Sequence, residues 1–264
     1  MGFFDLLIST VMFRPYVFVF LVMFLVSATF KVGPRKAVLF LLSGWFIAFV
    51  SEFSSVRNGI PFGLYHYIPA ATADRELWFW GIPLIDPVSF PFLAYASWSM
   101  ARVFLSRSTG VGPFFSLQDT SWRGDDSERF SLPVLFLGAV FFMLLDVVVD
   151  PVALQGDKWF LGKIYFYPDP GPYFGVTIEN FVGWFLVGLV ILLVWKYIDS
   201  QSSSLFMLES FPTVDLWGPV LYYSVAIFNV YMAFHIGEYA LGWAGVFIFL
   251  PVTALFLFRI FRLR

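Results

Sequence analysis

The stretch LPVLFLGAVFFMLLDVVVDPV, Leu132–Val152, is an apolar block in which the only charged residues are Asp146 and Asp150. A helix that crosses the hydrocarbon core of a bilayer takes about 20 predominantly apolar residues. The stretch is long enough for that, and it has no polar neighbours to solvate its two carboxyl groups. It therefore predicts a transmembrane helix that carries two acids near one end.

The composition of the whole chain agrees with a membrane protein. Its 264 residues are 59% hydrophobic, 22% aromatic and 13% charged, with a mean hydropathy of +0.81, whereas a soluble domain has about 25% charged residues. The apolar residues form long blocks rather than stripes. We predict an all-α, polytopic helical bundle that forms a single transmembrane domain over residues 1–264.

Seven apolar blocks are candidate spans, and Ser-rich or charged loops such as Ser106–Arg129 and Asp199–Ser210 separate some of them. The blocks are Pro15–Phe30, Ala37–Phe53, Ile82–Leu105, Leu132–Val152, Val176–Ile198, Leu216–Ile236 and Tyr239–Phe261. Lys and Arg are enriched in cytoplasmic loops. With seven spans, eleven of these cations fall on the side of the C-terminus and five on the other side. We expect an integral protein of a prokaryotic cytoplasmic membrane, with its C-terminus in the cytoplasm.

Polar residues recur at the non-cytoplasmic ends of these spans. The loops on that side, Ser54–Gly81 and Ala153–Gly175, are rich in Gly, Pro, Tyr and Trp, so we expect them to fold over the bundle. The polar set is Glu52, Asp86, Asp146, Asp150, Glu179, Asn180, His235 and Glu238. The topology predicts that acids far apart in sequence converge on one membrane face.

Asp146 and Asp150 are spaced i and i+4, so their side chains share one helical face. Two carboxyl groups that repel in a low-dielectric setting favour keeping a proton on at least one of them. Such an acid is a usable proton donor, and an intramembrane acid is a functional candidate by default. The alternative is that Asp150 only ends the helix, paired with Lys158 or Lys163. Asp146, one turn deeper, is the leading candidate for the donor.

The other polar residues also have structural alternatives. Glu52 could be an interfacial acid paired with Arg57, and Glu179 could interact with the helix dipole in a first turn. Asn180 is harder to explain in this way. The two histidines, His66 and His235, are expected to be interfacial hydrogen-bonding groups rather than metal ligands.

Several function classes do not fit the sequence. Two separated histidines cannot ligate a di-iron centre, and the chain has no cysteine for a thiolate site or nucleophile. The last two spans lack a lysine for a retinal Schiff base, and there is no Gly-rich phosphate loop. A prenyltransferase would need a second aspartate-rich motif. We expect no metal, no cofactor and no nucleic-acid partner, and the sequence does not indicate a protein partner.

The remaining hypothesis is acid chemistry on an apolar substrate. The chain contains 36 Phe, 12 Tyr and 10 Trp, and aromatic faces can stabilise a cation. An acid, aromatic faces and access to water together favour hydration of an isolated double bond through a tertiary carbocation.

Four motifs resemble those of the CruF-type carotenoid biosynthesis proteins, in the same order along the chain. They are GIPFGLYHY (Gly59–Tyr67, preceded by Glu52), GIPLIDP (Gly81–Pro87), DVVVDPVALQGDKWF (Asp146–Phe160) and YFGVTIENFVGW (Tyr173–Trp184). The likeness runs from about Glu52 to Trp184. This chain has Thr177 where the family usually has Pro.

The resemblance implies a carotenoid hydratase that adds water to the terminal double bond of an acyclic (ψ) end. The products would be tertiary alcohols, as in 1′-hydroxy-γ-carotene derivatives and bacterioruberin-type pigments. We expect a carotenoid substrate and a lipid membrane as partners, Asp146, Asp150 and Glu52 as catalytic candidates, and Asp86, Asn180, Tyr65, Tyr67, Trp184 and His235 as substrate-binding candidates. The alternatives are a non-catalytic pigment- or lipid-binding subunit and a proton-coupled transporter.

Overall fold

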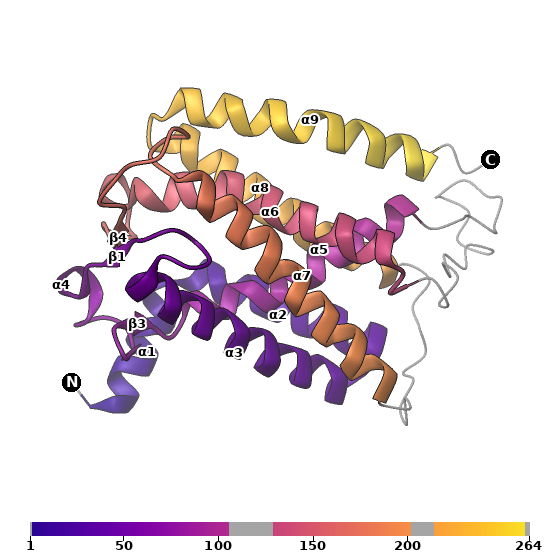
Figure 1. Cartoon of the computed structure of the whole chain (residues 1–264), viewed down its shortest axis with the longest axis horizontal. Helices are drawn as coiled ribbons and strands as arrows, with labels where there is room; N and C mark the ends of the chain where they lie inside the picture. The colour runs from indigo at the N-terminus through magenta and orange to yellow at the C-terminus, as the bar shows by residue number, and fades with distance from the viewer. Residues whose placement is uncertain (1, 106–128, 202–213, 262–264) are drawn as a thin grey trace.

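The computed structural model describes residues 2–105, 129–201 and 214–261 as a bundle of helices capped by loops (Figure 1). The predicted loops Ser106–Arg129 and Asp199–Ser210 lie largely outside the described residues. The helices are α1 (Phe3–Phe13), α2 (Pro15–Val32), α3 (Pro34–Asn58), α4 (Pro69–Thr72), α5 (Ser89–Leu105), α6 (Leu132–Leu154), α7 (Ile178–Gln201), α8 (Val214–His235) and α9 (Tyr239–Phe261). The prediction of an all-α membrane bundle is confirmed.

Six of the described helices are long and apolar enough to cross a membrane, namely α2, α3, α6, α7, α8 and α9. Helix α5 has 17 residues, and it packs against α6 and α8 as well as α2, α3 and α7. Every residue from Phe90 to Val103 is buried. Helix α5 is therefore the central helix of the bundle, and it is shorter than the helices around it.

The predicted third span began too early. The sequence analysis started it at Ile82, but Ile82–Pro83 forms strand β3, and Asp86–Val88 forms the 3₁₀ helix η1 before α5 begins at Ser89. Pro87 explains the difference, because it would lie in the interior of a helix that began at Ile82, where a proline removes a backbone hydrogen bond and clashes with the carbonyl of residue i−4. As a consequence Asp86 lies in a turn above the bundle rather than within a span.

Buried ion pairs close the end of the bundle where α2 and α7 end and α3 and α8 begin. Lys36 Nζ lies 2.8 Å from Asp199 Oδ1, and Arg129 contacts the other oxygen of that carboxylate at 2.5 Å. Asp215 pairs with Lys31 at 2.5 Å and with Arg102 at 3.2 Å. These contacts tie the helix ends together at the end predicted to face the cytoplasm.

The opposite end is covered by the loops that precede α5 and α7, as Figure 1 shows. Strand β1 (His66–Tyr67) pairs antiparallel with β4 (Tyr165–Phe166), with Tyr67 opposite Tyr165, and β2 (Trp78–Phe79) pairs with β3. Gly59 ends α3 in the left-handed conformation that favours glycine at this position. The two loops are thus joined to each other, and the expectation that they fold over the bundle is confirmed.

Candidate functional site

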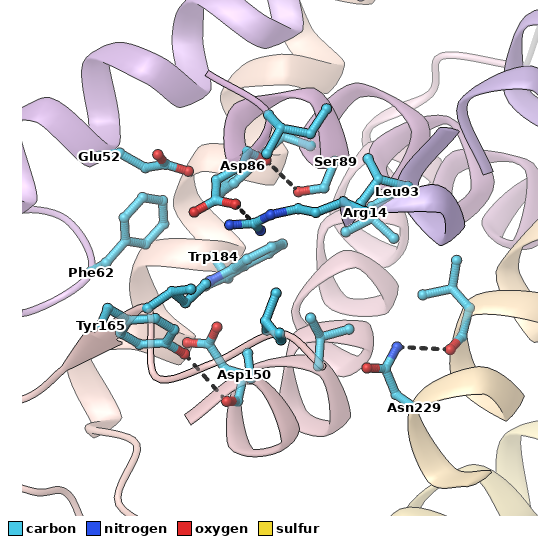
Figure 2. Close-up of a pocket in the computed structure, with 18 of the residues that line it drawn as sticks. Arg14, Glu52, Phe62, Asp86, Ser89, Leu93, Asp150, Tyr165, Trp184 and Asn229 are labelled. Atoms are coloured by element: carbon cyan, nitrogen blue, oxygen red, sulfur yellow. Dashed lines mark hydrogen bonds and ion pairs between the residues drawn. The ribbon is translucent and has the colours of Figure 1, made fainter. Parts of the chain in front are cut away.

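A cavity of about 150 Å³ lies beneath these loops, at the end of the bundle away from the ion pairs (Figure 2). Its walls come from α2, α3, α5, α6, α7 and α8 and from both loops. An apolar cavity of this size accommodates a group about as large as benzene. It can therefore receive one end of a long apolar molecule but not the whole of it.

Glu52 lies on the α3 wall of the cavity and is only 3% exposed. The hydroxyl of Tyr67 donates to Glu52 Oε2 at 3.1 Å. The alternative pairing with Arg57 is not found, because that guanidinium lies 3.5 Å from the ring centroid of Phe53 and donates to its backbone oxygen. Glu52 is thus held by a tyrosine, and it faces the cavity rather than the surface.

Asn180, in the first turn of α7, joins the two aspartates of α6. Its side-chain nitrogen donates to Asp146 Oδ2 at 2.7 Å and to Asp150 Oδ2 at 2.8 Å. Asp146 is fully buried, and its Oδ1 has no hydrogen-bond partner among the described residues. One amide group therefore serves two carboxyl groups.

The two aspartates differ in their access to the cavity. Asp150 lines it together with Asn180, whereas Asp146 is not among the lining residues. The alternative pairing of Asp150 with Lys158 is not found, because Lys158 pairs with Glu238. The sequence analysis favoured the deeper aspartate as the donor, but the aspartate that reaches the cavity is Asp150.

Arg14, between α1 and α2, is a buried cation in the cavity wall, only 3% exposed. Its Nε lies 2.8 Å from Glu76 Oε2, and its NH1 lies 2.5 Å from Asp86 Oδ1. Although burial alone would lower the pKa of Arg14, the Asp86 and Glu76 carboxylates raise it above its ordinary value. The guanidinium stays charged, and Asp86 has a fixed cationic partner.

Four tyrosines cover the cavity from the paired strands and the residues beside them: Tyr65, Tyr67, Tyr165 and Tyr167. Besides the Tyr67 contact described above, the hydroxyl of Tyr167 lies 3.5 Å from Asp150 Oδ2, and that of Tyr165 donates to the backbone oxygen of Asp150 at 3.2 Å. Burial raises the pKa of all four hydroxyls above the ordinary value of 10.0. They therefore remain protonated around neutral pH.

Aromatic faces form the apolar part of the wall. The rings of Trp184 and Phe90 stack with centroids 4.4 Å apart, and Phe62 lies 6.1 Å from Trp184. Gly183 makes this packing possible, because a Cβ there would lie 2.5 Å from the backbone oxygen of Pro61. Figure 2 shows Trp184 between the side chains of Arg14 and Asp150. These π faces can stabilise a cation formed in the cavity.

The structure brings together most of the residues that the sequence singled out, but not all of them. Glu52, Asp86, Asp150, Asn180, Tyr65, Tyr67 and Trp184 line the cavity. His235 does not: it is exposed at the end of α8 and stacks on Tyr231. The substrate-binding candidate His235 therefore lies outside the cavity, because its side chain is exposed at the helix end.

Arg14, Tyr165, Tyr167 and Asn229 line the cavity as well, and the sequence analysis did not select them as site residues. Arg14 was counted only as one of the five cations on the side away from the C-terminus. One signal could have indicated its position: it lies directly before the apolar block that starts at Pro15. Among the described residues, no group of three or more His, Cys, Asp or Glu side chains could hold a metal ion.

Comparison with known families gives one match. The family model described as "Carotenoid biosynthesis protein" matches residues 12–252, which includes every cavity-lining residue named above. No curated protein and no solved structure matches the chain.

Proposed function

Since the chain belongs to the carotenoid biosynthesis protein family, we propose that it is a hydratase that adds water to the terminal double bond of an acyclic (ψ) carotenoid end. One observation carries the proposal: two carboxyl groups from different helices, Glu52 and Asp150, line one aromatic cavity that fits the end of a long apolar molecule. The family match supports a role in carotenoid biosynthesis, and the hydration step rests on this geometry.

Asp150 is the proton donor in this mechanism. Asp146 and Asp150 share one amide group and have no cationic partner among the described residues, and holding two buried negative charges without compensation is costly. A proton on the pair removes that cost. Of the two, Asp150 can reach a bound double bond, while Asp146 and Asn180 hold it in place.

Glu52 accepts the proton that water loses. Tyr67 donates a hydrogen bond to this carboxylate, and Arg14 brings positive charge into the same cavity, although Asp86 and Glu76 balance it. These two contacts favour the negative form that a base needs, whereas the burial of Glu52 and the nearby carboxyl groups of Asp86 and Asp150 oppose it.

The reaction then balances without an oxidant or reductant. The π electrons of the terminal double bond take the proton of Asp150 and form a C–H bond, which leaves a tertiary cation beside Trp184 and Phe90. Water forms a C–O bond to that cation, and the extra proton on its oxygen passes to Glu52. The product is a tertiary alcohol, and the aromatic wall stabilises the cation along the way.

Expression in a host that accumulates an acyclic carotene tests the proposal. In medium enriched in H₂¹⁸O, we expect a more polar pigment that is heavier by one water, with the label in its hydroxyl group. Label from molecular oxygen would overturn the mechanism. Pigment that copurifies with the protein unchanged would instead identify a carotenoid-binding subunit.

A further inference from the structure

A row of three tyrosine side chains, in contact through their rings, lies between the two carboxyl groups that the proposed reaction uses. It starts at Tyr67, which donates to Glu52 at 3.1 Å, and ends at Tyr167, whose hydroxyl lies 3.5 Å from Asp150 Oδ2. Glu52 belongs to α3 and Asp150 to α6. The row therefore connects two walls of the cavity that the helices themselves keep apart.

Tyr65 occupies the middle of this row. Its ring centroid lies 5.4 Å from that of Tyr67 and 5.9 Å from that of Tyr167, both in edge-to-face arrangements. Tyr65 is 6% exposed, and all three rings line the cavity. A phenol hydroxyl both donates and accepts a hydrogen bond. Three such groups in sequence can pass a proton by accepting one on one side and releasing one on the other.

The proposed reaction leaves a problem that this row can solve. Each turnover takes a proton from Asp150 and delivers a proton from water to Glu52. Hydration consumes no net proton. After one turnover, however, the proton lies on Glu52, whereas the next turnover needs it on Asp150. A second turnover is possible only after that proton has returned.

We propose that Tyr67, Tyr65 and Tyr167 form a proton-return path from Glu52 to Asp150 that resets the enzyme after each hydration. The inference rests on the proposed function and extends it to the step after product formation. In that step, Glu52 donates to the hydroxyl of Tyr67, each hydroxyl passes its proton to the next, and Tyr167 donates to Asp150. One O–H bond breaks and one forms at every tyrosine oxygen, so the tyrosines end unchanged, while Glu52 loses the proton and Asp150 gains it.

The high pKa of these hydroxyls fits the concerted transfer. Burial raises the pKa of Tyr65, Tyr67 and Tyr167 above 10.0, so a tyrosinate is not formed on the way. Tyr165 has a different position, because its hydroxyl donates to the backbone oxygen of Asp150 at 3.2 Å. It stabilises the helical turn of α6 that carries Asp150, and the return path does not include it.

Two single substitutions, Tyr67→Phe and Tyr167→Phe, interrupt the path at its two ends and keep the rings. Tyr173→Phe is the matched control. Tyr173 belongs to the same loop as Tyr167 but lies outside the cavity lining, and its hydroxyl has no hydrogen-bond partner among the described residues. Purified protein in lipid nanodiscs is mixed with an acyclic carotene, and product is followed from the first turnover onward.

The expected result is a burst. In Tyr67→Phe and Tyr167→Phe the first hydration per enzyme should slow far less than the later turnovers, which should slow by roughly 10²-fold, the lower end for a lost proton-transfer group. The slow phase should carry a solvent deuterium isotope effect larger than that of the wild-type enzyme. Tyr173→Phe should match the wild type in both phases.

Other outcomes overturn the path. If both variants keep the wild-type steady-state rate, the proton returns by another route. If the first turnover slows as much as later ones, the hydroxyls serve binding or chemistry rather than the return step. If one of the two variants fails to fold, the other still tests the path. These results differ from a failure of the proposed function, in which the wild-type protein itself forms no labelled alcohol.

Discussion

The side-chain nitrogen of Asn180 lies 2.8 Å from Asp150 Oδ2 and also contacts the carboxyl group of Asp146. A residue in the first turn of α7 thus fixes the two acids of α6. Asp146, fully buried, contributes to the site through this amide, while Asp150 lines the cavity. The pair therefore has a buried inner member, Asp146, and an outer member, Asp150, that can reach a molecule in the cavity.

The first prediction separates these two roles. Asp150→Asn keeps the size of the side chain but removes the transferable proton, so hydration should fall by about 10²–10⁴-fold. Asp146→Asn should have a clearly smaller effect, because its carboxyl group does not reach the cavity. The measurement is the product ratio by pigment chromatography at matched protein levels. An inactive Asp146→Asn beside an active Asp150→Asn would reverse the assignment.

Glu52→Gln tests the base. The amide cannot accept a proton from water, so conversion should again fall by about 10²–10⁴-fold. Binding of the carotene should persist, because the aromatic wall is intact; copurified pigment, quantified by absorbance, measures this. Normal conversion by both Glu52→Gln and Asp150→Asn would mean that the acids are structural and that the proposed acid–base mechanism is wrong.

Arg14→Met should destabilise the protein rather than change its chemistry alone. The substitution leaves the buried carboxyl groups of Glu76 and Asp86 without their cation, and breaking a buried ion pair costs about 3–5 kcal/mol. The melting temperature in detergent should fall, and Arg14→Met combined with Glu76→Gln should recover part of the loss. Arg57→Ala, at an exposed cation that packs on Phe53, should leave the melting temperature nearly unchanged.

The buried tyrosines predict a loss of stability at alkaline pH. Burial raises the pKa of Tyr167 above 10.0, so the folded state holds its phenol proton more tightly than the unfolded state. Stability from this difference is complete below pH 10 and is lost as the pH rises above it. Melting temperatures measured from pH 8 to 12 should fall less steeply for Tyr167→Phe than for the wild type. Tyr197→Phe, at a position that is 65% exposed, should follow the wild-type curve.

Membrane orientation can be tested directly, because the chain has no cysteine. Asp157 and Ser200 are both exposed, and they lie at opposite ends of the bundle. In intact spheroplasts, a membrane-impermeant maleimide should label Asp157→Cys and spare Ser200→Cys until the membrane is opened. The reverse pattern would contradict a cytoplasmic C-terminus.

The sequence alone predicted the features that depend on short-range pattern. Apolar block length predicted seven spans; six of them match the helices that are long enough to cross a membrane, and the block Ile82–Leu105 contains the shorter α5. The i, i+4 spacing placed Asp146 and Asp150 on one face of α6. Which aspartate faces the cavity depends on how α6 is rotated against α7, and spacing does not determine that rotation. Helix α1 was missed because its 11 residues are too few for a span.

Long-range partners were also beyond the sequence. Arg14 meets Asp86 and Glu76 across more than 60 positions, and nothing local to these residues indicates the pairing. Tyr165 and Tyr167 reach the site only because β4 pairs with β1. The sequence named His235 as a substrate-binding candidate although it lies outside the cavity. A helix end can direct its last side chain toward the bundle or away from it, and the apolar pattern does not distinguish the two.

The size of the cavity also determines how a symmetric substrate would be processed. A carotene with two ψ ends can place only one of them in a cavity of about 150 Å³. The two ends must therefore react in separate binding events, and the molecule must be released and turned around between them. Hydration would then be distributive. The singly hydrated pigment becomes an obligatory free intermediate, which should accumulate early and be consumed as the unreacted carotene runs out.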